Sequence, residues 1–315
     1  MRRLFIWSGG WLVSLFLLVS GEGAVKPLSH ETYAAVQTAF LREDFEIVVK
    51  LAQPLLAEVS LTALQVPEQM SKMARVWLWC ILSLERLQRS ADALRELDRL
   101  KASLSNLPAQ TAATLGPEAL WPELFFWEGE ISRKALNMAR ARLAYQRVLA
   151  HFPNSSWRSQ AQMGLGIVLF QQQTYEEASS QFHAVAQAAP NSPIAREALL
   201  LEGLCEIQRK QFDEAIARFQ QLLTQPLDRG LRAQTAFYLG ESLTGLRRFD
   251  EALTTYQQAI ETDPDSQWAQ AAQFGLGWSY FQQHRCRESL QTFDGYLKQD
   301  PKAVESRVEL LFAQG

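Results

Sequence analysis

Cysteine and histidine are scarce in this chain of 315 residues, which contains three cysteines and four histidines. The cysteines form no Cys-x-x-Cys motif, and no histidine lies at i, i+4 spacing from another histidine or a cysteine. Metal sites depend on such spacings. Neither a Gly-x-Ser-x-Gly motif nor a Walker motif occurs. We therefore expect no metal, no cofactor and no catalytic residues, and we expect the cysteines to act as small apolar side chains.

A strong excess of charge is lacking as well. The chain has 31 lysines and arginines against 34 aspartates and glutamates, which gives a net charge of −3. This balance provides no electrostatic reason to expect binding to nucleic acid or to an anionic membrane. Apolar residues make up 47% of the chain, a proportion typical of a folded protein with a core.

Long hydrophobic runs are absent after the N-terminal segment. Residues 1–3 begin with a basic stretch, residues 4–19 are almost wholly apolar, and the small residues Gly21 and Gly23 follow. This order is typical of a secretory signal peptide, here residues 1–23, and an uncleaved anchor is the alternative. No cysteine stands directly after the apolar run, so a lipid anchor has no attachment point there. We expect the mature chain to be periplasmic or secreted.

The rest of the chain is dominated by a repeat. Five glycines stand 37 residues apart: Gly129, Gly166, Gly203, Gly240 and Gly277. Twelve residues after each glycine there is a small residue: Ala141, Ala178, Ala215, Ala252 and Ser289. Sixteen residues after each glycine there is an aromatic ring: Tyr145, Phe182, Phe219, Tyr256 and Phe293. A proline closes each unit, and in three units the next helix has a serine as its expected N-cap: Ser155, Ser192 and Ser266.

This pattern predicts a helical hairpin in each unit. A glycine inside a helix costs about 1 kcal/mol relative to alanine, so a close contact must offset that cost. We expect the glycine of the first helix to face the small residue of the second helix, with the ring one turn further along on the same face. One hairpin cannot bury its wide apolar face alone, so stacked hairpins form a solenoid.

The Leu-Gly pairs at 165–166, 239–240 and 276–277, followed by a small residue, an aromatic ring and proline, resemble the tetratricopeptide repeat. Its usual unit has 34 residues, and the three extra residues here fall between the proline and the next glycine. This longer variant is similar to tetratricopeptide proteins of the bacterial periplasm, including those that work with the Tol–Pal system and in outer-membrane assembly. The resemblance implies an all-α fold, a right-handed superhelical solenoid of helical hairpins.

The resemblance also suggests how the chain is divided. Residues 1–23 are the signal peptide, and residues 28–104 form two degenerate hairpins without the glycine. Residues 105–121 form a loop or hinge before the five regular repeats of residues 122–301. Residues 302–315 resemble the first helix of a further, incomplete repeat.

In such arrays the first helices line a concave groove, and partners contact positions −3, +1, +4 and +5 relative to the glycine. Carried over to this chain, the resemblance implies a partner-binding groove of apolar and amide side chains: Met163, Ile167, Phe170, Gln171, Leu200, Leu204, Ile207, Gln208, Phe237, Phe274, Trp278, Phe281 and Gln282. The alternative is that these side chains pack against one another.

The resemblance therefore implies a non-catalytic adaptor or scaffold of the bacterial cell envelope, with a segment of a partner protein in its groove. Two alternatives stay open. The array is the docking arm of an enzyme whose catalytic domain lies beyond residue 315, or it is a scaffold that assembles with copies of itself into a homo-oligomer.

Overall fold

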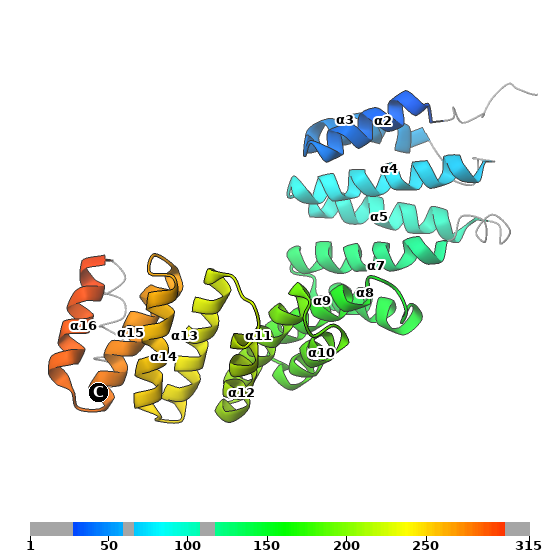
Figure 1. Cartoon of the computed structure of the whole chain (residues 1–315). Coiled ribbons are helices and arrows are strands. Elements are labelled where there is room, and N and C mark those ends of the chain that lie inside the picture. The colour runs from blue at the N-terminus through cyan, green and yellow to red at the C-terminus, as the bar shows by residue number, and fades with distance from the viewer. Residues whose placement is uncertain (1–27, 59–65, 108–116, 300–315) are drawn as a thin grey trace, which may run out of the picture. The chain divides into compact units, whose positions relative to one another are not determined.

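The structure is a computed structural model that describes residues 28–58, 66–107 and 117–299. These residues form fourteen α-helices and no strand, which confirms the predicted all-α solenoid of helical hairpins (Figure 1). None of the described helices combines the length and the apolar character needed to cross a membrane. The predicted signal peptide and the predicted helix at 302–315 lie outside the described residues.

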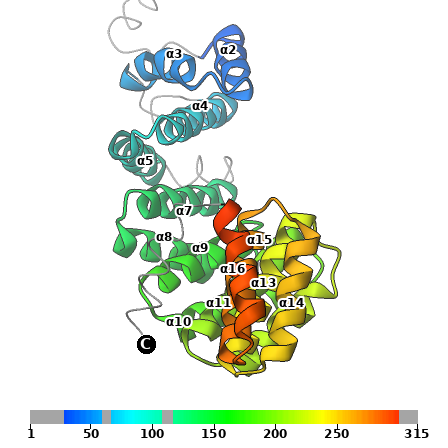
Figure 2. The same cartoon turned by 90° about the vertical axis from the view of Figure 1, so that its left-hand side faces the viewer.

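The chain divides into two compact units, residues 1–155 and residues 156–315. Unit 1 contains α2 (His30–Leu41), α3 (Phe45–Glu58), α4 (Pro67–Arg86), α5 (Ser90–Ser105), α7 (Pro117–Lys134) and α8 (Met138–His151). Unit 2 contains α9 (Arg158–Gln171), α10 (Tyr175–Ala188), α11 (Pro193–Gln208), α12 (Phe212–Leu223), α13 (Arg229–Gly245), α14 (Phe249–Thr262), α15 (Gln267–Gln282) and α16 (Cys286–Gln299). Within each unit every helix packs on the next one along the chain (Figure 1; Figure 2).

One boundary differs from the sequence prediction. Helix α7 begins at Pro117, inside the segment 105–121 that was expected to be a loop or hinge. Proline suits the first turn of a helix because its missing N–H needs no partner there, and its fixed φ is already helical. The part of this segment at 108–116 lies outside the described residues.

Helix starts follow the predicted caps in two of three cases. Ser192 Oγ accepts a hydrogen bond from Ala195 N at 3.2 Å, and Ser266 Oγ accepts one from Ala269 N at 3.2 Å. The third expected cap, Ser155, was wrong, because α9 begins later, directly after Trp157.

The seven hairpins within the described residues all turn in the same way. The second residue after each first helix has a left-handed backbone, with φ between 59° and 62°, at Glu43, Gln88, Leu136, Gln173, Lys210, Arg247 and His284. The next N–H bonds back to the carbonyl five residues earlier, as Asn137 N does to Ser132 O at 2.8 Å. This is a Schellman ending, which usually has glycine at the left-handed position.

The repeat glycines make room for the rings, and this corrects the sequence prediction. A Cβ on Gly203 would lie 2.5 Å from Phe219 Cε1, and a Cβ on Gly240 would lie 2.5 Å from Tyr256 Cε1. The small residues Ala141, Ala178, Ala215 and Ala252 are fully buried, and in the fifth unit Ser289 Oγ donates to Gly277 O at 2.9 Å, so the predicted contact with the small residue is present there as well. The ring atoms Cδ1, Cε1 and Cζ occupy the space that a Cβ at the glycine would need.

The shared turn also gives the register of the two degenerate hairpins. The left-handed residue follows the glycine by seven positions in regular units, so Val36 and Ile81 occupy the glycine position. Ala52 and Leu97 then occupy the ring position, and all four side chains are fully buried. These hairpins thus have an aliphatic pair at the two positions that glycine and a ring occupy elsewhere.

Candidate functional site

The first helices of unit 2 carry a continuous face at positions +1, +4 and +5 after the glycine. These spacings place three side chains on one side of a helix. We call this face the first-helix strip, and it consists of Ile167, Phe170, Gln171, Leu204, Ile207, Gln208, Glu241, Thr244, Gly245, Trp278, Phe281 and Gln282. The helices that carry it contact one another, α9 with α11, α11 with α13, and α13 with α15.

The apolar members of the strip remain accessible. Ile167, Phe170, Leu204, Ile207 and Trp278 are half-buried, and Phe281 is 51% exposed. Trp278 and Phe281 stack on each other with ring centroids 5.5 Å apart. Among the predicted amides, Gln171 and Gln208 are exposed and Gln282 is half-buried.

The predicted residues at position −3 are placed differently. Met163 and Leu200 are each only 6% exposed. Phe237 and Phe274 are half-buried against other rings, with centroids 6.2 Å from Tyr256 and 5.6 Å from Phe293, respectively. These four side chains contribute mainly to packing, so the accessible surface lies at +1, +4 and +5.

The sequence prediction missed Glu241, which occupies position +1 of α13. Its Oε1 accepts a hydrogen bond from the hydroxyl of Tyr256 at 2.5 Å. The same hydroxyl lies 3.2 Å from Thr244 Oγ1, at position +4. Burial and the nearby Glu241 carboxylate raise the pKa of Tyr256, so this phenol stays a neutral donor.

The same pairing occurs once more. In unit 1 Tyr145 donates to Glu130 Oε1 at 2.5 Å, and Glu130 again occupies position +1. Where the ring is phenylalanine, position +1 is apolar, with Ile167, Leu204 and Trp278. The hydroxyl of a tyrosine reaches the side chain at position +1 and needs a hydrogen-bond acceptor there. A buried tyrosine is therefore paired with a glutamate at +1, and a buried phenylalanine with an apolar residue. This association was the signal in the sequence that could have identified Glu241.

Unit 2 also contains two buried acids, Glu202 and Glu206. Glu202, which is 2% exposed, takes the place of the leucine in the Leu-Gly pair. Its Oε1 lies 2.8 Å from Arg218 Nε and 3.0 Å from His183 Nδ1. Burial raises the pKa of Glu202, and the charges of Arg218 and His183 oppose that rise. One turn later, the buried Glu206 accepts from Ser179 Oγ at 2.5 Å and pairs with Arg209 at 2.8 Å.

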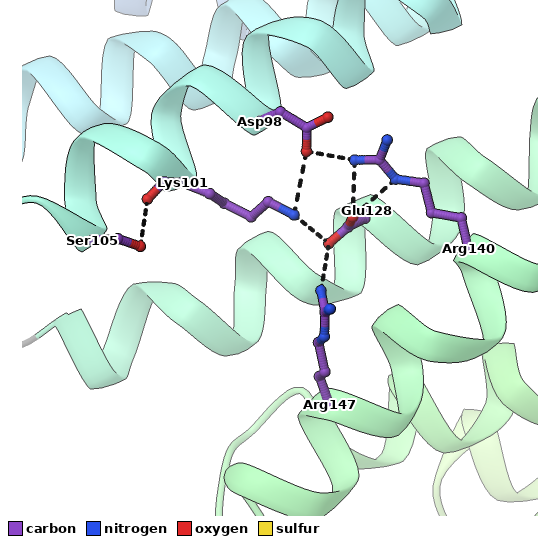
Figure 3. Close-up of polar contacts among 6 residues, drawn as sticks. All are labelled: Asp98, Lys101, Ser105, Glu128, Arg140 and Arg147. Carbon is purple, nitrogen blue, oxygen red and sulfur yellow. Dashed lines mark hydrogen bonds and ion pairs between the residues drawn. The ribbon is translucent and has the colours of Figure 1, made fainter.

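Unit 1 has its own buried acid at the same repeat position. Figure 3 shows Glu128 of α7 surrounded by cations from α5 and α8. Its carboxylate lies 2.7 Å from Lys101 Nζ, 2.9 Å from Arg140 and 3.9 Å from Arg147. Asp98 completes the network at 2.6 Å from Arg140. Every charge drawn is paired within the chain, so the network joins three helices and offers no vacant charged group.

A cavity of about 380 Å³ in unit 1 is lined by Gln53, Arg89, Asp92, Arg95, Glu96 and Arg99. Its cations are also paired: Arg89 lies 2.8 Å from Asp92, and Arg99 lies 2.8 Å from Glu96. No cluster of three or more potential metal ligands occurs among the residues that the structure describes.

The cysteines follow the prediction in two of three cases. Cys80 and Cys205 are free and buried, and burial raises the pKa of each thiol to about 12, so neither is a nucleophile at neutral pH. Cys286 is also free but exposed at the start of α16, so it does not act as apolar filling.

The stacked hairpins and their accessible strip define a class of protein, the α-helical repeat proteins whose fold serves as a protein-interaction scaffold. The profile of the tetratricopeptide repeat matches residues 128–193, 200–267 and 237–304, which together are more than half of the chain. The chain therefore belongs to the tetratricopeptide repeat family.

Solved structures agree with this fold. The crystal structure of MamA protein is 18% identical, with a TM-score of 0.51 over 59% of this chain and 94% of that one. MamA 41-end from Desulfovibrio magneticus RS-1 is 16% identical, with a TM-score of 0.50 over 58% of this chain and 96% of that one. These similarities show the fold alone. A comparison with curated proteins found no match.

Proposed function

We propose that this chain is a non-catalytic scaffold that holds an apolar segment of another protein along the first-helix strip of unit 2. The observation that carries the proposal is the accessibility of the apolar side chains at +1 and +4 on α9, α11 and α15. Other apolar residues on the same helices are fully buried, so the exposure of the side chains at +1 and +4 distinguishes them from the core. Exposed apolar side chains that gather on one face of a protein commonly mark an interaction site.

The test compares what the intact and altered strips capture. The triple variant Phe170→Ser, Ile207→Ser, Phe281→Ser should lose partners that the unaltered chain cross-links in an envelope extract, as quantified by mass spectrometry. The matched control is Leu143→Ser, which alters an exposed leucine of α8 outside the strip. Far-UV circular dichroism and melting should be nearly the same for all three proteins. Equal capture by the triple variant, or its unfolding, would count against a binding role.

We further propose that this scaffold works in the bacterial cell envelope. The support is the order of basic, apolar and small residues in residues 1–23, together with the 37-residue repeat that resembles envelope tetratricopeptide proteins. Fractionation followed by N-terminal sequencing checks this: the mature chain should begin after Gly21 or Gly23 and appear outside the cytoplasm.

Self-association is a second candidate function, and one observation favours it. Leu290 on α16 is 67% exposed, whereas its counterpart one repeat earlier, Leu253, is 9% exposed because α15 follows α14. A second copy of the chain would cover this face. Light scattering across a concentration series should then show a rising mass that Leu290→Glu abolishes. A constant monomer mass would contradict self-association, and the predicted helix at 302–315 would then be the expected cover of this face.

A further inference from the structure

We propose that the cavity lined by α3 and α5 in unit 1 binds a small oxyanion, a free ligand that carries a phosphate or carboxylate group. The cavity shares no residue with the first-helix strip of unit 2, so this binding is independent of the proposed function.

The cavity has the size of a small-molecule site and a polar lining. Its volume of about 380 Å³ lies within the range of ~300–1,000 Å³ that is typical of ligand pockets. Five of its six lining side chains are charged, and the sixth is Gln53. An apolar ligand would cover these groups without giving them hydrogen-bond partners, which is costly. The lining therefore favours a charged, polar ligand.

The charges of the lining are not balanced. It contains two carboxylates and three guanidinium groups, those of Arg89, Arg95 and Arg99. Asp92 pairs with both Arg89, at 2.8 Å, and Arg95. A guanidinium is a planar fork of five N–H donors that matches two oxygens of a carboxylate or phosphate. One such group in the cavity would balance the excess positive charge.

One wall of the cavity is held by a core residue. Trp77 is 1% exposed, and its Nε1 donates to Glu96 Oε2 at 2.9 Å. Glu96 accepts from Arg99 Nη1 at 2.8 Å, and Arg99 Nη2 donates to Leu56 O of α3 at 2.9 Å. The Arg99 guanidinium also lies over the Trp77 ring, 5.4 Å from its centroid. These contacts fix Arg99 before a ligand arrives, so binding costs little side-chain freedom there.

The regular repeats lack the pair of cations formed by Arg95 and Arg99. In the register of the shared turn, these arginines follow the glycine position, Ile81, by 14 and 18 residues. Like charges four residues apart on a helix destabilise it, and an anion bound between them removes that repulsion. The corresponding pairs in the regular repeats contain at most one cation: Leu143 and Arg147, Ser180 and Ala184, Ala217 and Gln221, Thr254 and Gln258, and Gln291 and Gly295.

Isothermal titration calorimetry of the full chain at low ionic strength tests the site, with sodium phosphate and sodium citrate as separate probes. We expect saturable binding of one anion per chain for at least one probe, and the tighter probe distinguishes phosphate from carboxylate chemistry. Arg95→Gln should weaken binding about tenfold, because it removes a charged donor from the cavity. Asp92→Asn should strengthen binding about threefold, because it releases Arg89 and Arg95 from a competing carboxylate.

The matched control is Arg248→Gln on α14. Arg248 and Glu251 form the same first-turn ion pair, at 2.6 Å, but Thr254 and Gln258 stand where the cavity has Arg95 and Arg99. This control should bind the anion as tightly as the unaltered chain.

Far-UV circular dichroism should show that all of these variants are folded. The absence of saturable binding for both probes would refute the site. Binding that Arg95→Gln leaves intact, that Arg248→Gln weakens equally, or that Asp92→Asn weakens would refute it as well.

Discussion

The contact between repeat glycine and buried ring leads to a quantitative prediction for Gly203 and Phe219. A Cβ at position 203 would lie 2.5 Å from Phe219 Cε1 and 2.6 Å from Cζ, well inside van der Waals contact. The ring is fully buried and has no room to retreat. Overpacking of this kind costs about 1–3 kcal/mol, while alanine gains about 1 kcal/mol of helix propensity over glycine. Gly203→Ala should therefore lower the free energy of unfolding by about 1 kcal/mol.

The same geometry predicts how a second substitution compensates. Leucine at position 219 lacks the ε and ζ atoms that the new methyl group would meet. Phe219→Leu alone should destabilise by leaving a cavity, but the double variant should be more stable than the sum of the single effects by about 1–2 kcal/mol. The degenerate hairpin of α4 and α5 supports this expectation, because it has the fully buried Ile81 and Leu97 at the corresponding positions.

Urea unfolding followed by circular dichroism at 222 nm measures all four proteins of this cycle. The control is Gly295→Ala on α16, where a Cβ would meet nothing within 4 Å. Without the overlap only the propensity term remains, so Gly295→Ala should stabilise by about 1 kcal/mol. Changes of opposite sign in the free energy of unfolding for Gly203→Ala and Gly295→Ala would support the proposed overlap. Additive effects of the Gly203 and Phe219 substitutions, or stabilisation by Gly203→Ala, would refute it.

Three further predictions concern the turns and the buried acids. Leu136 has a left-handed backbone and is 79% exposed, so Leu136→Gly should raise the urea midpoint, with a gain of about 0.5–1 kcal/mol. Glu128→Ala should destabilise by about 1–3 kcal/mol in the same assay, because Lys101 and Arg140 lose their buried acceptor and keep only the more exposed Asp98. The raised pKa of Glu202 means that the folded chain holds this proton more tightly than the unfolded chain. Its contribution to stability is therefore present at low pH and falls as pH rises from about 4.5 through the folded pKa, and Glu202→Gln should remove this part of the slope in melts across pH.

The regular hairpins could be predicted from the sequence because their contacts repeat. Glycine and ring recur at fixed positions in five units, and this regularity alone indicated paired helices. What the spacing could not show is which atoms take up the missing side chain of glycine. The small residue at +12 and the ring at +16 share one face of the second helix, and only coordinates distinguish which of them covers the glycine.

The register of the first two hairpins could not be predicted from the sequence, for a different reason. Val36 with Ala52 and Ile81 with Leu97 are ordinary helix residues, so nothing marks them as substitutes for glycine and a ring. The turn that reveals their register is a backbone feature. Its left-handed residue is glutamate at 43 and glutamine at 88, where glycine would have been a recognisable signal.

The candidate strip was predicted in part, and its binding role stays a prediction. Carrying family positions onto the chain found Ile167, Phe170 and Phe281, but it treated the first helices as equivalent and passed over Glu241. The residue that distinguishes this hairpin is the buried Tyr256 on α14. The equivalent rings at 182, 219 and 293 are phenylalanine.

That difference of a single hydroxyl connects the core of this array to its surface. A buried tyrosine needs a hydrogen-bond partner, because an unmet polar group in the interior is costly. The +1 side chain is within reach in both tyrosine units, and in both it is glutamate. Packing can thus specify where a charge appears on an otherwise apolar strip. In a repeat array whose hairpins share one backbone design, such a ring distinguishes the exposed face of one hairpin from that of the next.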